Sequence, residues 1–189
     1  KGMCASSGQL MPISVSITDT PVGYKPAKGL PVQITLAYNQ REATQPANFT
    51  FFNFGQKWNM TWLAYIKDYN STDNVERIEG GGGGQQFTAN ADIDSTLGVW
   101  RNEQMSGVVL KRIPATGTFD HYELHYQDGS KDYFALADAP NNYRRVFMTK
   151  RVDAQGNQTL LSYDSLFRLS TITDANGLTT TFCYDPSGT

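Results

Sequence analysis

The stretch Val152-Asp153-Ala154-Gln155-Gly156-Asn157 is followed, two residues later, by Leu160-Leu161-Ser162-Tyr163-Asp164. A second copy reads Thr173-Asp174-Ala175-Asn176-Gly177 and then Thr181-Phe182-Cys183-Tyr184-Asp185. Four landmarks recur at one offset of 21 residues: Asp153 and Asp174, Gly156 and Gly177, Tyr163 and Tyr184, Asp164 and Asp185. A fixed period near 20 residues indicates a repeat array.

Each unit combines a tight turn with short strands. In Asp-x-x-Gly, the aspartate side chain can bond the backbone two residues on, and the glycine supplies the positive φ that closes the turn. After the first turn, Thr159, Leu161 and Tyr163 alternate with their neighbours at a period of two, which is typical of a strand. A further strand, residues 168–173, leads into the next turn. Because a hairpin of this size is marginal in water, the sequence predicts an all-β fold of stacked antiparallel hairpins.

These residues carry a family resemblance. The pattern Tyr163-Asp164, Arg168-Leu169-x-x-Ile172-x-Asp174-x-x-Gly177 and Tyr184-Asp185 resembles the YD repeats of the Rhs/YD-repeat family. That family includes bacterial Rhs proteins, the C components of insecticidal Tc toxins and the animal teneurins. The resemblance covers residues 149–185 and departs from the family pattern at Phe167, where many units carry glycine. The repeat landmarks are Asp153, Gly156, Tyr163, Asp164, Arg168, Asp174, Gly177, Tyr184 and Asp185.

The resemblance implies that the repeats spiral into a curved β-sheet shell, which often encloses a C-terminal effector such as a toxin. The front half, around residues 19–24 and 38–42, is similar to the region before the first repeats in some large bacterial Rhs-type proteins. We therefore expect a β-rich N-terminal cap over residues 1–110, degenerate repeat hairpins over 111–148 and two YD repeats over 149–189. We also expect a fragment of a longer bacterial protein that is secreted or displayed at the cell surface.

The composition argues against two classes of partner. The chain has 189 residues, with 16 basic and 18 acidic side chains, so it lacks the basic footprint that nucleic acid requires. No apolar run approaches the roughly 20 residues of a membrane span. Hydrophobic residues make up 39% of the chain, which is enough for a packed core.

The only cysteines are Cys4 and Cys183. One bridge could join them, but they lie in regions that we expect to be separate. The strand position of Cys183 suits a small buried hydrophobic residue. We therefore expect two free thiols.

The most aromatic window runs from residue 49 to residue 66. Flat rings stack on sugar faces, so Trp58, Trp62 and Tyr65 are candidate ligands for a glycan. The alternative is that the rings are buried and plug the end of the repeat array, because array ends need a cap. Burial is the favoured interpretation, and a carbohydrate-binding or adhesive surface module is the second hypothesis for the chain.

Residues 121–134 give the clearest hairpin signal, with Asp128-Gly129 predicting a two-residue turn. On the first strand, His121, Glu123 and His125 share one face, and these residue types suit zinc or another transition metal. Because same-face neighbours on a strand lie roughly 7 Å apart, we favour an ordinary polar face and predict no metal site.

Other segments are predicted to be ordinary turns, loops or strand connections. The run Gly80–Gly84 lacks the Lys-Ser/Thr of a phosphate loop and predicts a strand connection. Residues 92–98 lack the closing glutamate of a calcium loop and predict a turn. The polar segment 67–79 predicts a loop in which Val75 and Ile78 are possible strand residues, and residues 20–26 predict a turn and extended chain.

No catalytic motif is present: there is no nucleophile motif, no Walker loop and no dinucleotide fingerprint. A paired-carboxylate hydrolase stays open, because carboxylates pair in space rather than in sequence. The landmark acids are better explained structurally, with Asp153 and Asp174 opening turns and Asp164 and Asp185 ending strands. We therefore expect a non-enzymatic segment without cofactor. Its expected partners are the remainder of the same chain and an enclosed effector, and its exposed edge strands favour self-association.

Overall fold

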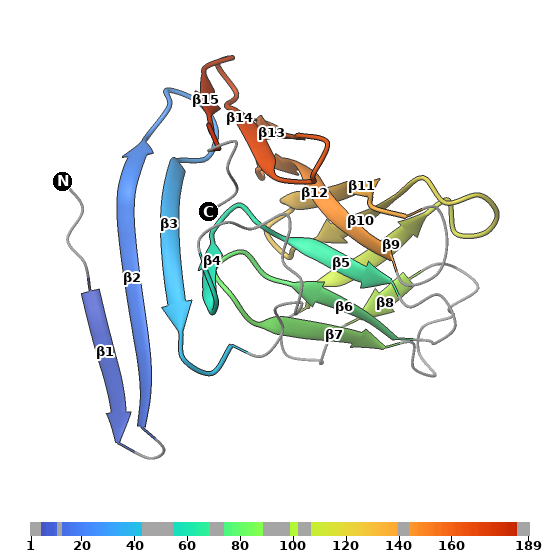
Figure 1. Ribbon diagram of the computed structural model, residues 1–189. Helices are drawn as coiled ribbons and strands as arrows, with labels where there is room; N and C mark the ends of the chain where they lie inside the picture. The colour runs from blue at the N-terminus through green and yellow to red at the C-terminus, as the bar shows by residue number, and fades with distance from the viewer. Residues whose placement is uncertain are drawn as a thin grey trace.

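The computed structural model of the chain describes residues 5–10, 13–42, 55–68, 74–88, 99–101, 107–139 and 144–184. Within these ranges all regular secondary structure is β-strand, arranged in two antiparallel sheets, so the all-β prediction is confirmed. Figure 1 shows the smaller sheet standing beside the larger one, which curls on itself.

The smaller, N-terminal sheet consists of β1 (Ala5–Leu10), β2 (Ile13–Tyr24), β3 (Val32–Asn39) and β4 (Trp58–Met60), paired in that order. Of the turn and extended chain expected over residues 20–26, the extended chain is present, because β2 continues to Tyr24, and the turn does not form at Thr20. The register between β2 and β3 shifts between Asp19 and Val22, and Pro21 lies in this irregularity. Proline lacks an N–H group, and a break in the ladder is one place where a strand tolerates it.

In the larger sheet, eight strands pair in a closed cycle, each antiparallel to both neighbours; we call this cycle the ring. It runs through β5 (Tyr65–Asp68), β6 (Asn74–Ile78), β7 (Gly84–Thr88), β8 (Val99–Arg101), β9 (Val109–Ile113), β10 (His121–His125), β11 (Lys131–Ala137) and β12 (Arg144–Val152). The cycle closes where β12 pairs with β5. The loop predicted over residues 67–79 is wrong at β6. The two possible strand residues of that segment, Val75 and Ile78, do lie in this strand and are buried in the core. Strands from both sides of the expected boundary at residue 110 take part, and the three-part division stays a prediction.

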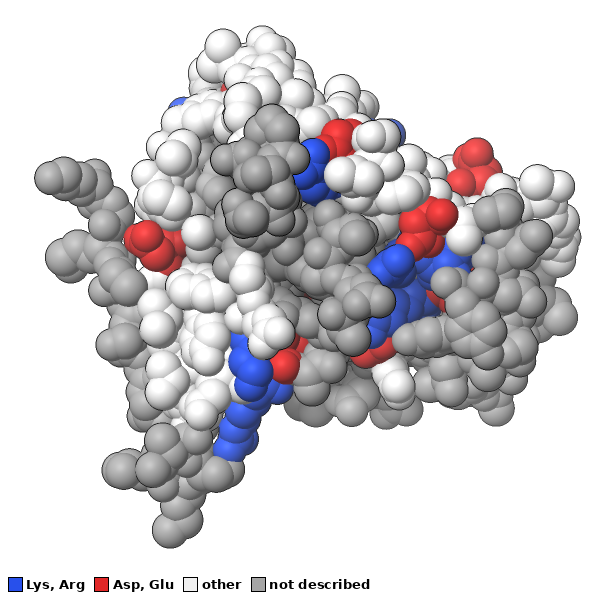
Figure 2. All heavy atoms as spheres, in the orientation of Figure 1, with Lys and Arg blue, Asp and Glu red and all other residues white. Residues whose placement is uncertain are grey.

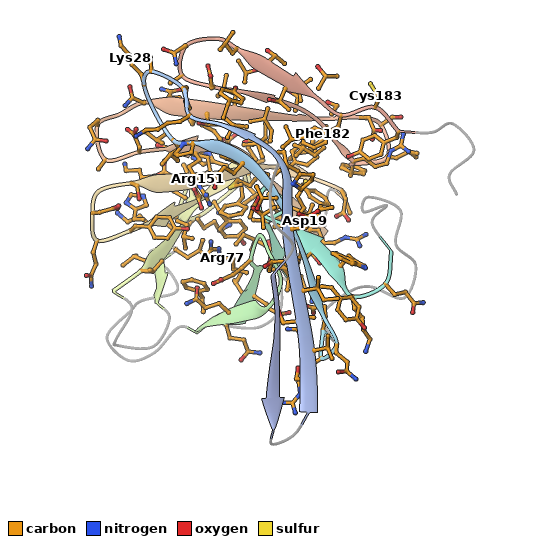
Figure 3. All side chains as sticks on the ribbon, turned by 90° about the vertical axis from the view of Figure 1, so that its left-hand side faces the viewer. Asp19, Lys28, Arg77, Arg151, Phe182 and Cys183 are labelled. Atoms are coloured by element: carbon orange, nitrogen blue, oxygen red, sulfur yellow. The ribbon has the colours of Figure 1, made fainter. Side chains whose placement is uncertain are left out.

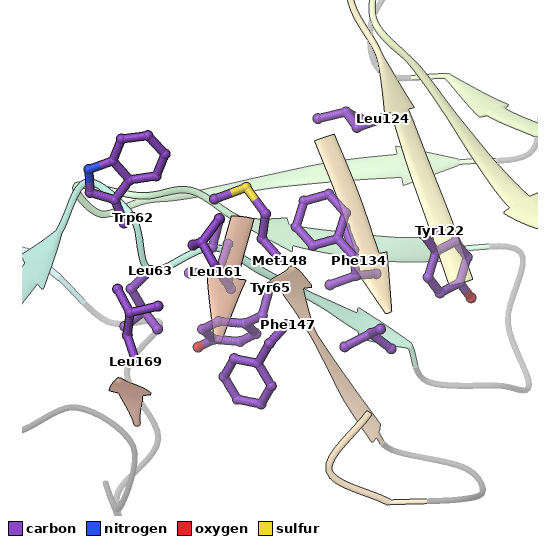
Figure 4. Packing of buried hydrophobic residues seen from close by; sticks show 14 of the residues in the cluster. Trp62, Leu63, Tyr65, Tyr122, Leu124, Phe134, Phe147, Met148, Leu161 and Leu169 are labelled. Carbon is purple, nitrogen blue, oxygen red and sulfur yellow. The ribbon is translucent and has the colours of Figure 1, made fainter. Parts of the chain in front are cut away.

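One face of the ring strands points inward and forms the core. On β10, Tyr122 and Leu124 are buried, whereas the residues between them are only partly buried, as expected for alternating strand positions. Phe134 and Met148 contribute from β11 and β12, and Figure 4 shows these side chains grouped between the strands. Full burial of one such side chain stabilises the fold by about 1.5–3 kcal/mol.

A second apolar layer covers the outside of the ring at β5 and β12. Tyr65 and Phe147 are paired across these strands, and their ring centroids are 5.5 Å apart. Phe147 also contacts Tyr163 at 5.5 Å and stacks on Phe167 at 5.6 Å with an interplanar angle of 17°. The repeat segment is therefore packed against the ring through aromatic side chains.

The repeat strands continue the larger sheet beyond the ring. They are β13 (Gln158–Tyr163), β14 (Leu169–Thr173) and β15 (Thr179–Thr181), each antiparallel to the one before. Figure 1 shows them stacked above β12, next to one end of β2 and β3. The predicted pairing of neighbouring hairpins is confirmed for these strands.

Two glycine-containing turns differ in how well they were predicted. The run Gly80–Gly84 connects β6 to β7, as predicted, and a Cβ on Gly80 would lie 2.0 Å from the carbonyl oxygen of Thr61. The turn between β10 and β11 is a three-residue loop, since Tyr126 N–H donates to the Ser130 carbonyl at 3.0 Å and Gly129 has φ 87°. The predicted two-residue turn is therefore wrong, and a type I turn followed by a left-handed glycine forms instead.

Candidate functional site: the junction of the ring and the repeats

Three turns in the repeat segment, which begin at Asp153, Asp164 and Asp174, share one hydrogen-bond pattern. In each, the aspartate N–H donates to the carbonyl four residues on, at 3.0, 2.9 and 2.9 Å, and its carbonyl accepts from the N–H three residues on, at 3.0 Å. One carboxylate oxygen accepts two further backbone N–H groups at 2.8–3.0 Å. Asp153 and Asp174 thus form turns as predicted, and Asp164, which was expected only to end a strand, does the same.

These hydrogen bonds favour the ionised carboxylates. The Asn157 side-chain amide is the main cause that lowers the pKa of Asp153. Burial would raise the pKa of Asp164 and of Asp174, but backbone N–H groups lower both overall, with help from Arg168 at Asp164. Arg168 Nε donates to the second oxygen of Asp164 at 2.7 Å. The acids of the repeat therefore act as anionic turn caps.

Phe167 occupies the position that glycine takes in the other two turns. Its φ is 60°, while Gly156 and Gly177 have φ of 85° and 84°. A bulky residue in this left-handed region is an outlier that costs energy, and the surrounding structure must compensate. The stacking of Phe167 on Phe147 supplies that compensation. At this position, where many units of the family carry glycine, the chain therefore has a strained left-handed backbone at Phe167 and gains aromatic packing on Phe147.

The two repeat tyrosines make the same long-range hydrogen bond. The hydroxyl of Tyr163 donates to the carbonyl of Met148 at 2.6 Å, and that of Tyr184 donates to the carbonyl of Leu169 at 2.8 Å. Both bonds span 15 residues and are related by the 21-residue offset. Burial raises the pKa of Tyr163, and raises that of Tyr184 to about 12, so both hydroxyls stay protonated and able to donate.

The first of these bonds lies where β12 changes partner. Through residues 144–147, one edge of β12 pairs with β5, and through residues 150–152 it pairs with β13. At the change, Met148 N–H donates to the Ala64 carbonyl at 3.0 Å, while its carbonyl accepts from Tyr163. Met148 therefore joins the ring to the first repeat hairpin. Sequence reasoning missed this residue, although the 21-residue offset that relates it to Leu169 was available as a signal.

The second unit is also held by the N-terminal sheet. Tyr24 donates its hydroxyl hydrogen to Asp174 Oδ2 at 3.0 Å. In the first unit, the corresponding oxygen of Asp153 accepts from Asn157 Nδ2 at 2.8 Å. Gly29, with φ 84°, lies so close to the repeat turns that a Cβ there would be 2.9 Å from Ala175 Cβ. The connection between β2 and β3 is thus pressed against both repeat turns.

The candidate glycan residues are not arranged as a platform. Trp62 and Tyr65 are buried at 4% and 2% exposure, and Trp62 Nε1 donates to the Gln33 carbonyl at 2.9 Å. Trp58 is half-buried, and its ring is tilted by 55° against Tyr38. Two buried rings cannot stack on a sugar, which matches the interpretation that the aromatic window is packed. The phenylalanines of residues 49–54 lie outside the described residues.

The structure brings His121, Glu123 and His125 together through hydrogen bonds. Glu123 Oε2 is 2.6 Å from His125 Nε2, and Glu123 Oε1 is 3.3 Å from His121 Nε2. Burial opposes ionisation of Glu123, but hydrogen bonds from both histidines lower its pKa overall. In the described part of the chain, no group of three His, Cys, Asp or Glu side chains is arranged to hold a metal ion. The imidazoles here pair with the carboxylate itself.

The remaining expectations concern the cysteines, a membrane span and the surface charge. Cys183 is a free, exposed thiol rather than a buried one. Cys4, Asp185 and the segment 92–98 lie outside the described residues. The described ranges hold no apolar helix of membrane-spanning length. On the face shown in Figure 2, acidic and basic side chains of the described residues are interspersed, without a broad basic patch.

The geometry of the turns and tyrosines agrees with a comparison of the sequence with known families. Residues 148–179 match the family model described as RHS Repeat. This segment is an RHS repeat. The match begins at Met148, the residue that joins the ring to β13, and includes all three turns. The resemblance to the Rhs/YD-repeat family is thus confirmed for this segment, and the likeness of the front half stays a prediction. No curated protein matches the chain.

Proposed function

We propose that this chain is a wall segment of a YD-repeat shell, in which the ring closes one part of the wall and β12 starts the repeat array. One observation supports this most directly: β12 pairs with the ring and with the first repeat hairpin along the same edge. A strand shared in this way makes the two parts one continuous sheet. An RHS repeat is a structural repeat, and the residues at its landmarks cap turns and join strands.

In this proposal the shell belongs to a bacterial protein that is secreted or displayed at the cell surface. The shell encloses or presents a C-terminal effector such as a toxin. A shell of this kind needs a wall that adds units without a break. The Tyr163 and Tyr184 bonds support this, because each ties one unit to the neighbouring strand of the sheet: Tyr163 of β13 binds β12, and Tyr184, which follows β15, binds β14. The wall would then extend by further units with the same bond.

The test uses the full-length parent protein in a protease-protection assay. The expected result is that the region after the repeats resists a protease that cleaves it readily once the wall is unfolded. A Tyr163→Phe, Tyr184→Phe double variant should weaken the protection, and Arg112→Lys, which changes a side chain remote from the repeats, serves as the control. Rapid cleavage of that region in the folded full-length protein would contradict the proposal that the shell encloses it. A reading frame without further Tyr-Asp units would contradict the array.

A carbohydrate-binding module remains the second hypothesis, and no observed feature favours it over the wall. The buried positions of Trp62 and Tyr65 count against it. A glycan array probed with the intact chain separates the two, since the wall proposal predicts no saturable binding that depends on Trp58.

A further inference from the structure

The interior of the ring contains two polar clusters of similar design, one around each of two buried aspartates. We call them the Asp68 cluster (Asp68, Tyr122, Arg144) and the Asp132 cluster (Arg77, Gln85, Tyr126, Asp132, Arg151). In each, a tyrosine at the inward face or end of β10 donates its hydroxyl hydrogen to the aspartate at 2.8 Å. In each, an arginine from β12 binds the same aspartate through Nε and Nη2.

In the Asp68 cluster, the β12 arginine binds the carboxylate directly. Arg144 Nε and Nη2 lie 2.8 and 2.6 Å from Asp68 Oδ2, and the guanidinium also lies over the Phe119 ring at 3.6 Å. One arginine thus faces one carboxylate. A buried charge pair of this kind is tolerated when its hydrogen bonds are satisfied.

The Asp132 cluster has two arginines for one fully buried carboxylate. Arg151 takes both oxygens of Asp132, at 2.6 and 2.7 Å, so Arg77 Nη2 is left 3.9 Å from that carboxylate. Arg77 instead donates to the Tyr126 hydroxyl at 3.0 Å and pairs at 3.3 Å with Glu79, whose side chain is 43% exposed. A half-exposed partner is screened by water and compensates a buried guanidinium only weakly.

Two buried polar atoms of this cluster have no hydrogen-bond partner among the described residues: Arg77 Nε and Gln85 Oε1. The two residues are directly opposite each other in the β6–β7 register. They share the inward face with the next pair, Val75 and Phe87, which is buried. The two unpaired atoms are therefore a cationic donor and a carbonyl acceptor on opposite residues of neighbouring strands, and leaving such groups unpaired is costly.

We propose that this end of the ring binds a small carboxylate that also carries a hydroxyl group. The carboxylate would accept from Arg77 Nε and add a negative charge beside a guanidinium that the half-exposed Glu79 compensates only weakly, since arginine pairs with carboxylates through its fork of donors. The hydroxyl would donate to Gln85 Oε1. The cluster is only partly enclosed, since the side chains of Arg151 and Glu79 are 27% and 43% exposed. Figure 3 shows Arg77 and Arg151 on one side of the body. This site is independent of the proposed wall function.

The test is a titration of the intact chain with glycolate, followed by the NMR resonance of the Arg77 Nε–H group. Glycolate should shift that resonance saturably. Acetate, which has no hydroxyl, and glycolamide, which has no charge, should each bind at least about tenfold more weakly. Arg77→Lys keeps the charge but removes Nε and should abolish binding. Arg112→Lys, in ring strand β9 opposite Tyr122 of the Asp68 cluster, should bind as the unmodified chain does. Gln85→Leu should bring glycolate down to the affinity of acetate.

A failure would be plain in the unmodified chain. If glycolate leaves the Arg77 Nε–H resonance unmoved, or moves it only linearly with concentration as a general salt effect, the proposal is overturned. Equal binding of acetate and glycolate would overturn the role given to Gln85. Neither outcome requires a variant to fold, and neither bears on the wall.

Discussion

The two repeat units have the same local hydrogen bonds but different surroundings. Both turns are capped by an aspartate and closed by a left-handed glycine, and each unit has a tyrosine that donates to a carbonyl 15 residues back. In the first unit Leu161 is 5% exposed and belongs to the core, whereas Phe182 in the second unit is only partly buried against it. Leu178, just after the second turn, is 60% exposed.

This difference separates what a repeat sequence encodes from what its position adds. The turn and the tyrosine bond depend on residues within about one and a half units, so they form in both copies. Burial depends on what lies next to the unit: the first copy lies against the ring, and the second is covered in part by the N-terminal sheet. Because each repeat contacts mainly its neighbours, its stability is a local contribution plus an interface contribution.

The largest expected difference between the units comes from their apolar strand residues. Leu161→Ala should lower the free energy of unfolding by about 3 kcal/mol, as for other buried leucines. Phe182→Ala should cost roughly half as much, because the ring it removes is only partly buried. Urea denaturation of both variants beside the parent measures this. Equal costs would mean that both units are equally covered in solution.

The next effect concerns the tyrosine bonds. Tyr163→Phe removes the donor to a backbone carbonyl at the edge of the ring, and leaving that carbonyl unpaired should cost about 1–2 kcal/mol. Tyr184→Phe should cost less, because the Leu169 carbonyl lies nearer the open end of the sheet, where water can replace the hydroxyl. Hydrogen exchange at Leu161 and Ile172 would report which strand loosens in each variant. A larger cost at Tyr184 than at Tyr163 would contradict the described junction.

The sequence was most informative where structure is local. The 21-residue offset, the Asp-x-x-Gly turns and the alternation after Asp153 predicted β13, β14 and their pairing, because each depends on residues close in the chain. The segment of β6 was predicted as a loop with only Val75 and Ile78 as possible strand residues, since it is polar and its burial comes from pairing with β5 and β7. The sequence showed that Phe167 stands where many units of the family carry glycine. It did not show that the Phe167 ring stacks on Phe147 while its backbone keeps the left-handed conformation.

Long-range contacts could not be predicted in this way. Tyr24 and Asp174 are 150 residues apart, and no periodic signal relates them. The change of partner along β12 depends on where β5 ends, which the sequence of β12 does not contain. The pairing of Arg77 with a carboxylate already taken by Arg151 is likewise visible only once β6, β11 and β12 are placed around one interior. These are properties of the closed ring, not of any one segment.

A smaller effect tests the exchange of glycine for Phe167. Phe167→Ala loses the ring that stacks on Phe147 and keeps the left-handed backbone strain. Phe167→Gly loses the same ring but relieves the strain, so it should be more stable than the alanine variant by about 1 kcal/mol. In an ordinary strand the alanine variant would be the more stable of the two, because glycine destabilises a strand relative to alanine. Thermal unfolding of the two variants therefore decides whether this turn has the same backbone as the glycine turns of the two units.

The smallest effect concerns the carboxylates that cap the two glycine turns, and it can be measured atom by atom. Both Asp153 and Asp174 have lowered pKa values, so their stabilisation is present above the pKa of the unfolded chain and is lost as the pH falls through the folded value. Tyr24→Phe should raise the pKa of Asp174 alone, since only that carboxylate accepts from the N-terminal sheet. Asn157→Ala should raise the pKa of Asp153 alone, since its amide serves only the first turn.

Carbon NMR of the two carboxyl groups in a pH titration reads both values in one sample, and each variant is the control for the other. The most informative outcome is one in which only one of the two variants changes the pKa of its carboxylate. If Tyr24→Phe leaves the pKa of Asp174 unchanged while Asn157→Ala moves that of Asp153, then the turns form as described but the N-terminal sheet does not hold the second unit in solution. The second unit would then depend on its own turn and on the Tyr184 bond, and the two units would differ by burial alone.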